Sequence, residues 1–303
     1  MILRWLPILA PALLALLISM LFNQSQVSNP VIVLRMDLSV FIFIFGIILS
    51  FFAGVGLFIN DWIERRHIQS LLEAAQERRR FLSRLDHELK NPLTAILAAM
   101  ANLRSADSTQ EREGSIQSVE TQMRRMRTLV GDLRKLAELE TRAIELAPVE
   151  TARLLQENYE LAHDRPDAEK REWTLSIPQA PWPLPPVLAD RDLLFLAIHN
   201  LIDNALKFTR EGDTIELRAY EDGANVVIEV ADTGPGIPEA ELSQVWDELY
   251  RGESARGIPG SGLGLALVRA IVARHNGKVT VRSRSGQGTV FSMQIPSVEV
   301  TKR

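Results

Sequence analysis

The sequence predicts a membrane-anchored multidomain protein: two transmembrane helices, a dimeric helical hairpin that forms a four-helix bundle, and an α+β sandwich domain. Two uncharged apolar runs lie near the start of the chain, and helical stripes of apolar residues follow them. Strand-like and helical runs then mix in the second half of the sequence. With 303 residues the chain is long enough for an anchor and about two domains.

The two apolar runs are residues 5–22 and 38–59. Each is long enough to cross the hydrocarbon core of a bilayer, which takes about 20 residues. A cleaved signal peptide is the alternative interpretation of the first run. Only residues 23–37 separate the runs, so the external loop is too short to form a sensor domain. A stimulus is therefore expected to enter through membrane lipid or through another membrane protein.

The distribution of charge predicts the orientation in the membrane. Arg65 and Arg66 follow the second run, whereas the loop between the runs offers only Arg35. The positive-inside rule therefore predicts a multi-pass protein of the cell inner membrane, with residues 60–303 in the cytoplasm. A net charge of −4 and a pI of 5.8 give no reason to expect nucleic acid as a partner. Without cysteines, disulfides and thiolate metal sites are excluded.

The first helix after the membrane runs carries a histidine opposite its apolar stripe. That stripe consists of Phe81, Leu85, Leu89, Leu93, Ile96, Met100 and Leu103. His87 therefore faces solvent, with Glu88 next to it and Asn91 one turn later on nearly the same face. An exposed neutral imidazole is a good nucleophile, and an idle surface histidine is the alternative. Pro92 should bend or loosen the helix just beyond.

A second stripe, after the polar turn "SADSTQEREG", predicts dimerisation. Its apolar residues alternate steps of three and four in a heptad seam: Ile116, Val119, Met123, Met126, Val130, Leu133 and Ala137. Two amphipathic helices joined by a short turn cannot bury both apolar faces alone, so a second copy is expected to complete a four-helix bundle. The alternative is a monomeric hairpin packed on the next domain.

The C-terminal part mixes strands and helices. Five strand-like runs are "EWTLSI", "TIELRAY", "NVVIEVAD", "KVTVRSR" and "TVFSMQI", and helical runs cover residues 190–208 and about 262–275. In the first helical run Asn200, Asn204 and Lys207 share one face. Amide oxygens suit Mg²⁺ when phosphates bring the negative charge, and the lysine can meet a phosphate. A merely solvated face is the alternative.

Two glycine-rich stretches follow. "VADTGPGIP" places Asp232 at the end of a strand, where it can accept a hydrogen bond from an exocyclic amine. Gly234 and Gly236 then let the backbone approach a flat ring, although an ordinary turn has the same composition. "GSGLGLALV" brings Gly260, Gly262 and Gly264 to the start of a helix, which binds phosphate through free N–H groups. It lacks the strand of a dinucleotide fingerprint and the Gly-Lys-Ser/Thr of a P-loop.

Six motifs in this order resemble those of the bacterial two-component sensor histidine kinases, over residues 78–297. They are "FLSRLDHELKNPLTAI" for the H box, "HNLIDNALKFT" for the N box, "VADTGPGIP" for the first glycine box, "VWDELYRGE" for the F box, "GSGLGLALV" for the second glycine box and "GQGTVFSM" for the final glycine-threonine element. The resemblance implies a HisKA-type dimerisation hairpin and the Bergerat ATP-binding sandwich shared with gyrase and Hsp90.

The resemblance also implies the roles of individual residues. His87 would take the γ-phosphate of ATP and pass it to an aspartate of a response regulator, with Glu88 as base and Asn91 orienting water when the regulator is dephosphorylated. Asn204 would bind Mg²⁺, and Asp232 would read the adenine amino group with support from Thr289. The other implied nucleotide contacts are Asn200, Lys207, Gly234, Gly236, Tyr250, Gly260, Gly262, Leu263 and Gly264.

The sequence departs from the family pattern at three places. Asp86 stands where serine is frequent, Trp246 replaces the usual phenylalanine of the F box, and the segment before the H box is too short for a HAMP relay. The predicted parts are a membrane hairpin (1–60), a helical linker (61–80), a phosphotransfer hairpin (81–146), an ATP-binding domain (147–298) and a tail (299–303). A nonenzymatic scaffold and an ATPase of the gyrase type are the competing hypotheses; complete motifs argue against the first and the H box against the second.

Overall fold

A computed structural model describes residues 38–105, 108–179, 181–255 and 257–298 of the chain. Side chains are described from Phe51 onward, apart from four single positions within the first helix. The chain divides into two compact units, residues 1–73 and 74–303, and each is treated by itself. The first predicted membrane run, 5–22, lies outside the described residues.

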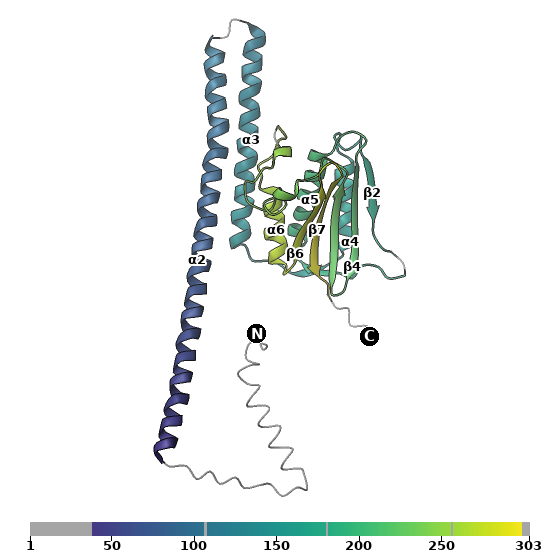
Figure 1. Ribbon diagram of the computed structural model, residues 1–303. Helices are drawn as coiled ribbons and strands as arrows, with labels where there is room; N and C mark the ends of the chain where they lie inside the picture. Colours follow the sequence, from purple (N-terminus) through teal and green to yellow (C-terminus); the bar gives the residue numbers. More distant parts are fainter. Residues whose placement is uncertain (1–37, 106–107, 180, 256, 299–303) are drawn as a thin grey trace. The chain divides into compact units, whose positions relative to one another are not determined.

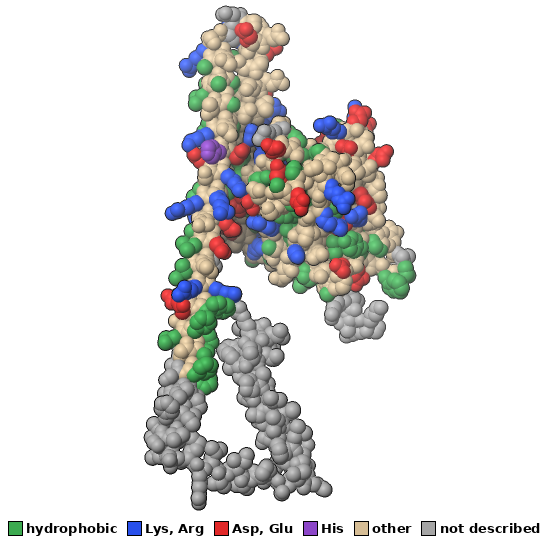
Figure 2. Space-filling view, viewed as in Figure 1, with side chains coloured by type: hydrophobic (Ala, Val, Ile, Leu, Met, Phe, Trp, Pro, Cys, Tyr) green, Lys and Arg blue, Asp and Glu red, His purple; other side chains and the backbone are tan. Residues whose placement is uncertain are grey.

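The first unit contributes the beginning of helix α2 (Leu38–Ser105), into which the second apolar run falls. A search of the described residues finds no helix that combines the length and apolarity needed to cross a membrane. Large apolar residues of this segment are exposed, with relative accessibilities of 65–73% at Phe51, Phe52, Leu57 and Phe58. Figure 2 shows them as a green surface on the helix.

In the second unit α2 runs antiparallel to α3 (Thr109–Thr141), as the two stripes predict (Figure 1). Pro92 lies inside α2, which continues to Ser105. Helix α3 begins within the segment "SADSTQEREG", which the sequence predicts to be a turn. Its N-cap residue is Ser108. The Ser108 hydroxyl accepts from the backbone N–H of Glu111, and the Glu111 carboxylate accepts from the backbone N–H of Ser108. This capping box is a sequence signature that the polar composition of the segment had obscured.

Helix α3 carries apolar residues on two of its faces. Leu129 and Leu139, which lie outside the predicted stripe, are buried within the unit. Ile116, Met123 and Val130, at seven-residue spacing, remain 47%, 57% and 55% exposed. The predicted alternatives of packing on the next domain and leaving a seam for another chain therefore apply to different faces of one helix.

The C-terminal domain is built around a five-stranded sheet in the order β2-β4-β5-β7-β6, in which β2 pairs with β4 in parallel and the other pairs are antiparallel. Its strands are β2 (Glu172–Ser176), β4 (Thr214–Asp222), β5 (Asn225–Asp232), β6 (Lys278–Arg284) and β7 (Gly288–Pro296). All five predicted strands are confirmed.

The helices α4 (Thr151–His163), α5 (Arg191–Phe208) and α6 (Gly264–Arg274) form a second layer (Figure 1). Alternate residues of the central strands point into this layer: Leu217 of β4 pairs with Val230 of β5, which pairs with Phe291 of β7, and all three are almost fully buried. The fold is thus a two-layer α/β sandwich with its core between sheet and helices.

Three elements of this domain are missing from the sequence prediction. Helix α4 buries Leu154, Leu155 and Ala162, yet its only sequence cue beforehand was the punctuation "APVE". The strands β1 (Ala147–Val149) and β3 (Val187–Ala189) form a separate two-stranded sheet. Each has three residues, too few to show an alternation, and they pair only because the fold brings distant segments together.

Candidate functional site

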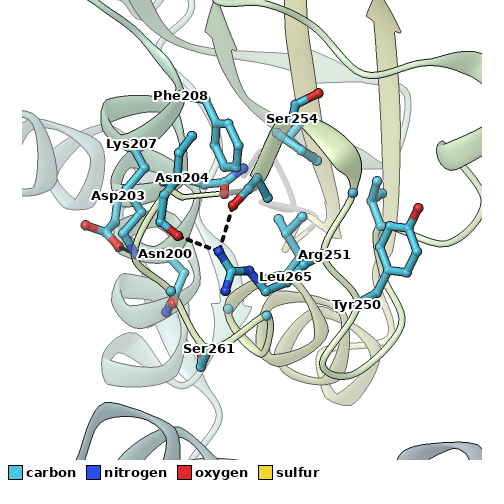
Figure 3. Close-up of a pocket in the computed structure, with 18 of the residues that line it drawn as sticks. Asn200, Asp203, Asn204, Lys207, Phe208, Tyr250, Arg251, Ser254, Ser261 and Leu265 are labelled. Atoms are coloured by element: carbon cyan, nitrogen blue, oxygen red, sulfur yellow. Dashed lines mark hydrogen bonds and ion pairs between the residues drawn. The ribbon is translucent and has the colours of Figure 1, made fainter. Parts of the chain in front are cut away.

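A cavity of about 370 Å³ lies at one end of the sandwich, beside α5 (Figure 3). Its walls come from one face of α5, the ends of β5 and β7, the segment between β5 and α6, and the first turn of α6. Helix α3 of the hairpin adds Thr128, Asp132 and Lys135. Parts of the chain more than 100 residues apart therefore share one cavity.

The polar face of α5 points into this cavity, as Figure 3 shows for Asn200, Asn204 and Lys207. The opposite face of the helix is apolar and buried, which fixes the rotation of α5 about its axis. The side-chain N–H of Asn200 donates to the carbonyl of Leu196 at 2.7 Å. The oxygen of the Asn200 amide is thereby turned away from its own helix.

Lys207 is paired within the cavity to a carboxylate that the sequence reading did not single out. Its ammonium lies 2.6 Å from Asp203, whose other oxygen lies 3.2 Å from Arg165. Burial raises the pKa of Asp203, but hydrogen bonds and charge from Lys207 and Arg165 outweigh it and lower the pKa overall. The i, i+4 spacing to Lys207 was the available sequence signal.

Asp232 ends β5 with its carboxylate at the cavity and only 9% of the residue exposed. Burial raises its pKa from 3.8 to about 6, against the lowering effect of backbone hydrogen bonds from Gly234 and Thr289. The N–H of Gly234 donates to the carboxylate at 2.9 Å. A buried carboxyl group that faces a cavity and has a raised pKa is a feature of binding and catalytic sites.

Thr289 lies opposite Asp232 in the β5–β7 ladder. Its hydroxyl is 2.9 Å from that of Ser283 on β6, which also donates to the carbonyl of Gly288 at 2.7 Å and accepts from the N–H of Ile237 at 2.8 Å. Ser283 therefore holds both the threonine and the segment after β5. Sequence reasoning missed it, because its neighbours in space come from two other places in the chain.

Two glycines of the second glycine stretch are required by close approach. Gly262 has φ +73°, and a Cβ there would lie 3.0 Å from the backbone of Leu249. Gly264 begins α6, and a Cβ there would lie 3.2 Å from the amide oxygen of Asn200. The start of α6 has no side-chain cap, so its free N–H groups face the cavity beside that oxygen.

The segment before this stretch is held from within. Arg251 donates to the carbonyls of Ala255, at 2.7 Å, and Ile258, and Figure 3 shows its guanidinium among the cavity-lining residues. Leu249 has φ 60°, a left-handed conformation that is strained for a leucine. Its N–H donates to the carbonyl of Gly262 at 3.0 Å. This lid, residues 246–255 and 257–263, is thus hydrogen-bonded to the segment that leads into α6.

The hairpin docks on the lid. Leu129 of α3 packs with Leu249 and Leu263 in one small apolar cluster. Arg84 of α2 donates to the carbonyl of Glu248 at 3.0 Å and pairs with Asp247 at 3.3 Å. Trp246 instead faces the core, where its ring meets that of Phe291 edge-on at 5.6 Å.

The structure separates the predicted site residues into two groups. Those that line the cavity are Asn200, Asn204, Lys207, Asp232, Gly236, Tyr250, Gly260, Gly262, Gly264 and Thr289. Gly234 and Leu263 do not line the cavity, but each contacts a neighbouring element: Gly234 donates its N–H to the carboxylate of Asp232, and Leu263 packs with Leu129 and Leu249. The three residues predicted for catalysis, His87, Glu88 and Asn91, belong to α2 and do not line it.

His87 is exposed on α2, as its position opposite the apolar stripe predicts. Glu88 pairs with Arg125 of α3 at 2.7 Å, with one fifth of its side chain exposed. Asp86 pairs with Lys90 at 2.5 Å on the helix surface. The two carboxylates beside His87 are therefore both held by cations, one from each helix of the hairpin.

Two family models match the chain. The model described as His Kinase A (phospho-acceptor) domain matches residues 77–142, and the one described as Histidine kinase-, DNA gyrase B-, and HSP90-like ATPase matches residues 189–299. The sensor-like histidine kinase SenX3 of Mycobacterium tuberculosis is 33% identical over 235 residues, covering 75% of this chain and 55% of the relative. The adaptive-response sensory kinase SasA of Thermosynechococcus vestitus is 34% identical over 243 residues, covering 77% and 63%.

Solved structures agree with this likeness. The crystal structure of full-length ShkA in complex with AMPPNP has a TM-score of 0.50 and 33% identity, covering 72% of this chain and 45% of that one. The complex of ThkA with the response regulator protein TrrA, at 23% identity, has a TM-score of 0.59 over 74% of this chain and 63% of that one, which is a likeness of fold. The chain spans about half the length of the first curated relatives that it matches.

Proposed function

Because this chain belongs to the two-component sensor histidine kinases, we propose that it is an ATP-dependent protein-histidine kinase that phosphorylates itself on His87. The phosphate would then pass to an aspartate of a response regulator, and the same protein would also dephosphorylate the regulator, with Asn91 orienting the water that attacks the aspartyl phosphate. The observation that carries the proposal is the cavity: an amide-and-lysine face, a buried carboxylate and a glycine-rich helix start meet there, in one chain with an exposed histidine.

The cavity suits the three parts of ATP. Asp232, buried at one end, is an acceptor for the exocyclic amine of adenine, and the Ser283–Thr289 pair fixes its surroundings. The free N–H groups at the start of α6 and the ammonium of Lys207 are donors for phosphates. Gly264 leaves room for the amide oxygen of Asn200 in this arrangement, because a side chain at position 264 would crowd that oxygen.

The donor set also fits Mg²⁺ bound together with the phosphates. Asn204 and Asn200 offer neutral amide oxygens, which Mg²⁺ accepts when phosphate oxygens supply the negative charge. Among the described residues there is no cluster of three or more acidic or histidine side chains that could hold a metal on its own. Bound Mg²⁺ would offset charge that develops on the transferred phosphoryl group.

The side chains proposed to carry out the phosphoryl transfer lie on the hairpin. A ring nitrogen of His87 attacks the γ-phosphorus, the N–P bond forms, and the bond to the bridging oxygen breaks as ADP leaves with the electron pair. Glu88, oriented by Arg125, takes the proton from the imidazole. His87 does not line the cavity of its own chain in this arrangement. The hairpin must therefore leave the lid, or a second copy must present its histidine.

A second copy is the partner that we propose for the open face of the hairpin. Leu93, Leu97 and Met100 of α2 are 46–68% exposed, beside the exposed heptad positions of α3. A homodimer would bury both faces in a four-helix bundle. The prediction is a dimer of the full chain in sedimentation experiments, which Met123→Glu should disrupt.

We also propose that residues 1–60 anchor the protein in the inner membrane with the kinase region in the cytoplasm. The exposed apolar surface of α2 from Phe51 to Phe58 supports this proposal, together with the arginines that follow it. The external loop is too short for a sensor domain, so membrane lipid or a membrane protein would deliver the stimulus. Selective labelling of single introduced cysteines from either side of the membrane would test the orientation.

The first experiment incubates the full chain in lipid nanodiscs with γ-labelled ATP and Mg²⁺, beside His87→Gln. Label that is acid-labile and alkali-stable, and that is absent from the variant, is the expected result. His163→Gln is the matched control, since this histidine lies on α4 away from the cavity, and it should label like the wild type. If His87→Gln also labels, the assignment of the acceptor is wrong. If ATP binds and neither protein labels, the chain is a nonenzymatic scaffold.

A further inference from the structure

Helix α3 inserts a carboxylate into the nucleotide cavity. One oxygen of Asp132 accepts a hydrogen bond from the Ser261 hydroxyl at 2.7 Å, and the other lies 3.3 Å from the ammonium of Lys135. The Asp132 side chain is 21% exposed and Ser261 is 8% exposed. This contact joins residues 129 positions apart and is part of the docked hairpin.

Ser261 is the residue between the two glycines that lead into α6. Its hydroxyl oxygen accepts from the N–H of Leu263 at 3.2 Å while its proton goes to Asp132. Gly260 precedes it in the chain, and a Cβ at Gly260 would lie 4.0 Å from the ammonium nitrogen of Lys207. The carboxylate of Asp132 therefore meets the stretch whose free N–H groups and neighbouring lysine suit a phosphate.

A serine hydroxyl has one proton to donate, so it serves one anion at a time. A carboxylate and a phosphate that approach the same hydroxyl in a partly buried cavity also repel each other. We propose that Asp132 competes with the phosphates of ATP for Ser261, so that the docked hairpin keeps the cavity in a state of low nucleotide affinity. This inference rests on the proposed function, since it takes ATP as the ligand of the cavity.

Other contacts of the docked hairpin couple the competition for Ser261 to the lid. Leu129, one turn before Asp132, packs against Leu249 and Leu263. Leu249 is the residue of the lid with the strained backbone, and Leu263 directly precedes α6. Losing the Asp132–Ser261 bond removes the polar contact beside this apolar cluster. By reciprocity, ATP weakens hairpin docking by the same factor by which docking weakens ATP binding. Nucleotide binding thus favours the undocked hairpin, which is one of the two ways by which a histidine could reach the cavity.

The test measures affinity for AMPPNP, which is not hydrolysed, and for adenosine, which has no phosphate, on the full chain in nanodiscs. Asp132→Asn keeps the shape of the side chain and removes its charge. It should tighten AMPPNP binding by about tenfold and leave adenosine binding unchanged. Glu120→Gln is the matched control, because it makes the same chemical change on α3 at an exposed position outside the cavity. It should change neither affinity.

A double variant tests whether the gain in affinity depends on Ser261. Removing Asp132 also frees Lys135, which by itself would attract phosphate, so the same measurement is made in a Ser261→Ala background. Competition for the hydroxyl predicts a smaller gain there, whereas a gain of equal size would overturn the inference. It is overturned as well if Asp132→Asn binds AMPPNP no more tightly than wild type, or if adenosine gains equally. A wild-type protein that binds no AMPPNP at all would overturn the proposed function and, with it, this inference.

Discussion

Removing the charge of Asp232 is expected to stabilise the folded protein and to weaken nucleotide binding. Burial raises the pKa of this carboxyl from 3.8 to about 6 in the folded state. Because the folded-state pKa lies above the unfolded one, the folded protein holds the proton more tightly, and ionisation costs stability that builds up between about pH 4 and pH 6 and is fully present above that window. Each pKa unit corresponds to about 1.4 kcal/mol, so a rise of about two units costs up to ~3 kcal/mol at pH 8. The cost falls to roughly half at pH 5 and to about a fifth at pH 4.

Asp232→Asn keeps an acceptor for the N–H of Gly234 and carries no charge. At pH 8 its unfolding temperature, followed by tryptophan fluorescence of the full chain in nanodiscs, should rise by on the order of 6–12 °C. At pH 5 the rise should be about half as large. The variant should bind AMPPNP roughly 10- to 100-fold more weakly, because an amide is a poorer acceptor than a carboxylate.

Asp222→Asn is the control, since Asp222 is exposed at the far end of β4. It should leave the unfolding temperature unchanged at both pH values. A stabilisation by Asp232→Asn that is absent at pH 8, or that is the same at pH 5 and pH 8, would refute the reasoning that burial raises the pKa.

Three further predictions concern backbone positions. Gly264→Ala places a Cβ 3.2 Å from the amide oxygen of Asn200, so AMPPNP affinity should fall while the unfolding temperature changes little; unchanged affinity would contradict the packing at the start of α6. Gly114→Ala adds a methyl group inside α3 with no atom within 4 Å, and should stabilise the hairpin by ~0.5–1 kcal/mol, measured by chemical denaturation; a loss of stability would show that this turn is not helical. Ser108→Ala removes one half of the capping box and should cost ~0.5–2 kcal/mol in the same assay, with faster hydrogen exchange at the start of α3; no change in exchange there would argue against the cap.

Features that depend on neighbours along the chain could be read from the sequence. The five strands of the sheet and the polar face of α5 follow from alternation and from helical spacing, which require only local order. The exposure of His87 follows from the same argument, because His87 lies on the side of α2 opposite the apolar stripe. The capping box at Ser108 was also local, and a search for that motif would have found it.

Features that depend on distant contacts required the fold. Asp132 and Ser261 are ordinary polar residues in their own segments, and only the docking of α3 on the lid makes them partners. The short strands β1 and β3 are too brief to carry a pattern, and they pair across more than 30 residues. Burial of Asp232 at the end of β5 gives this carboxyl a raised pKa that its motif alone does not express. The sequence by itself determined which chemical groups each helix and strand presents, because periodicity is a local property; the tertiary structure decided which of those groups meet, because packing brings together residues that the chain separates.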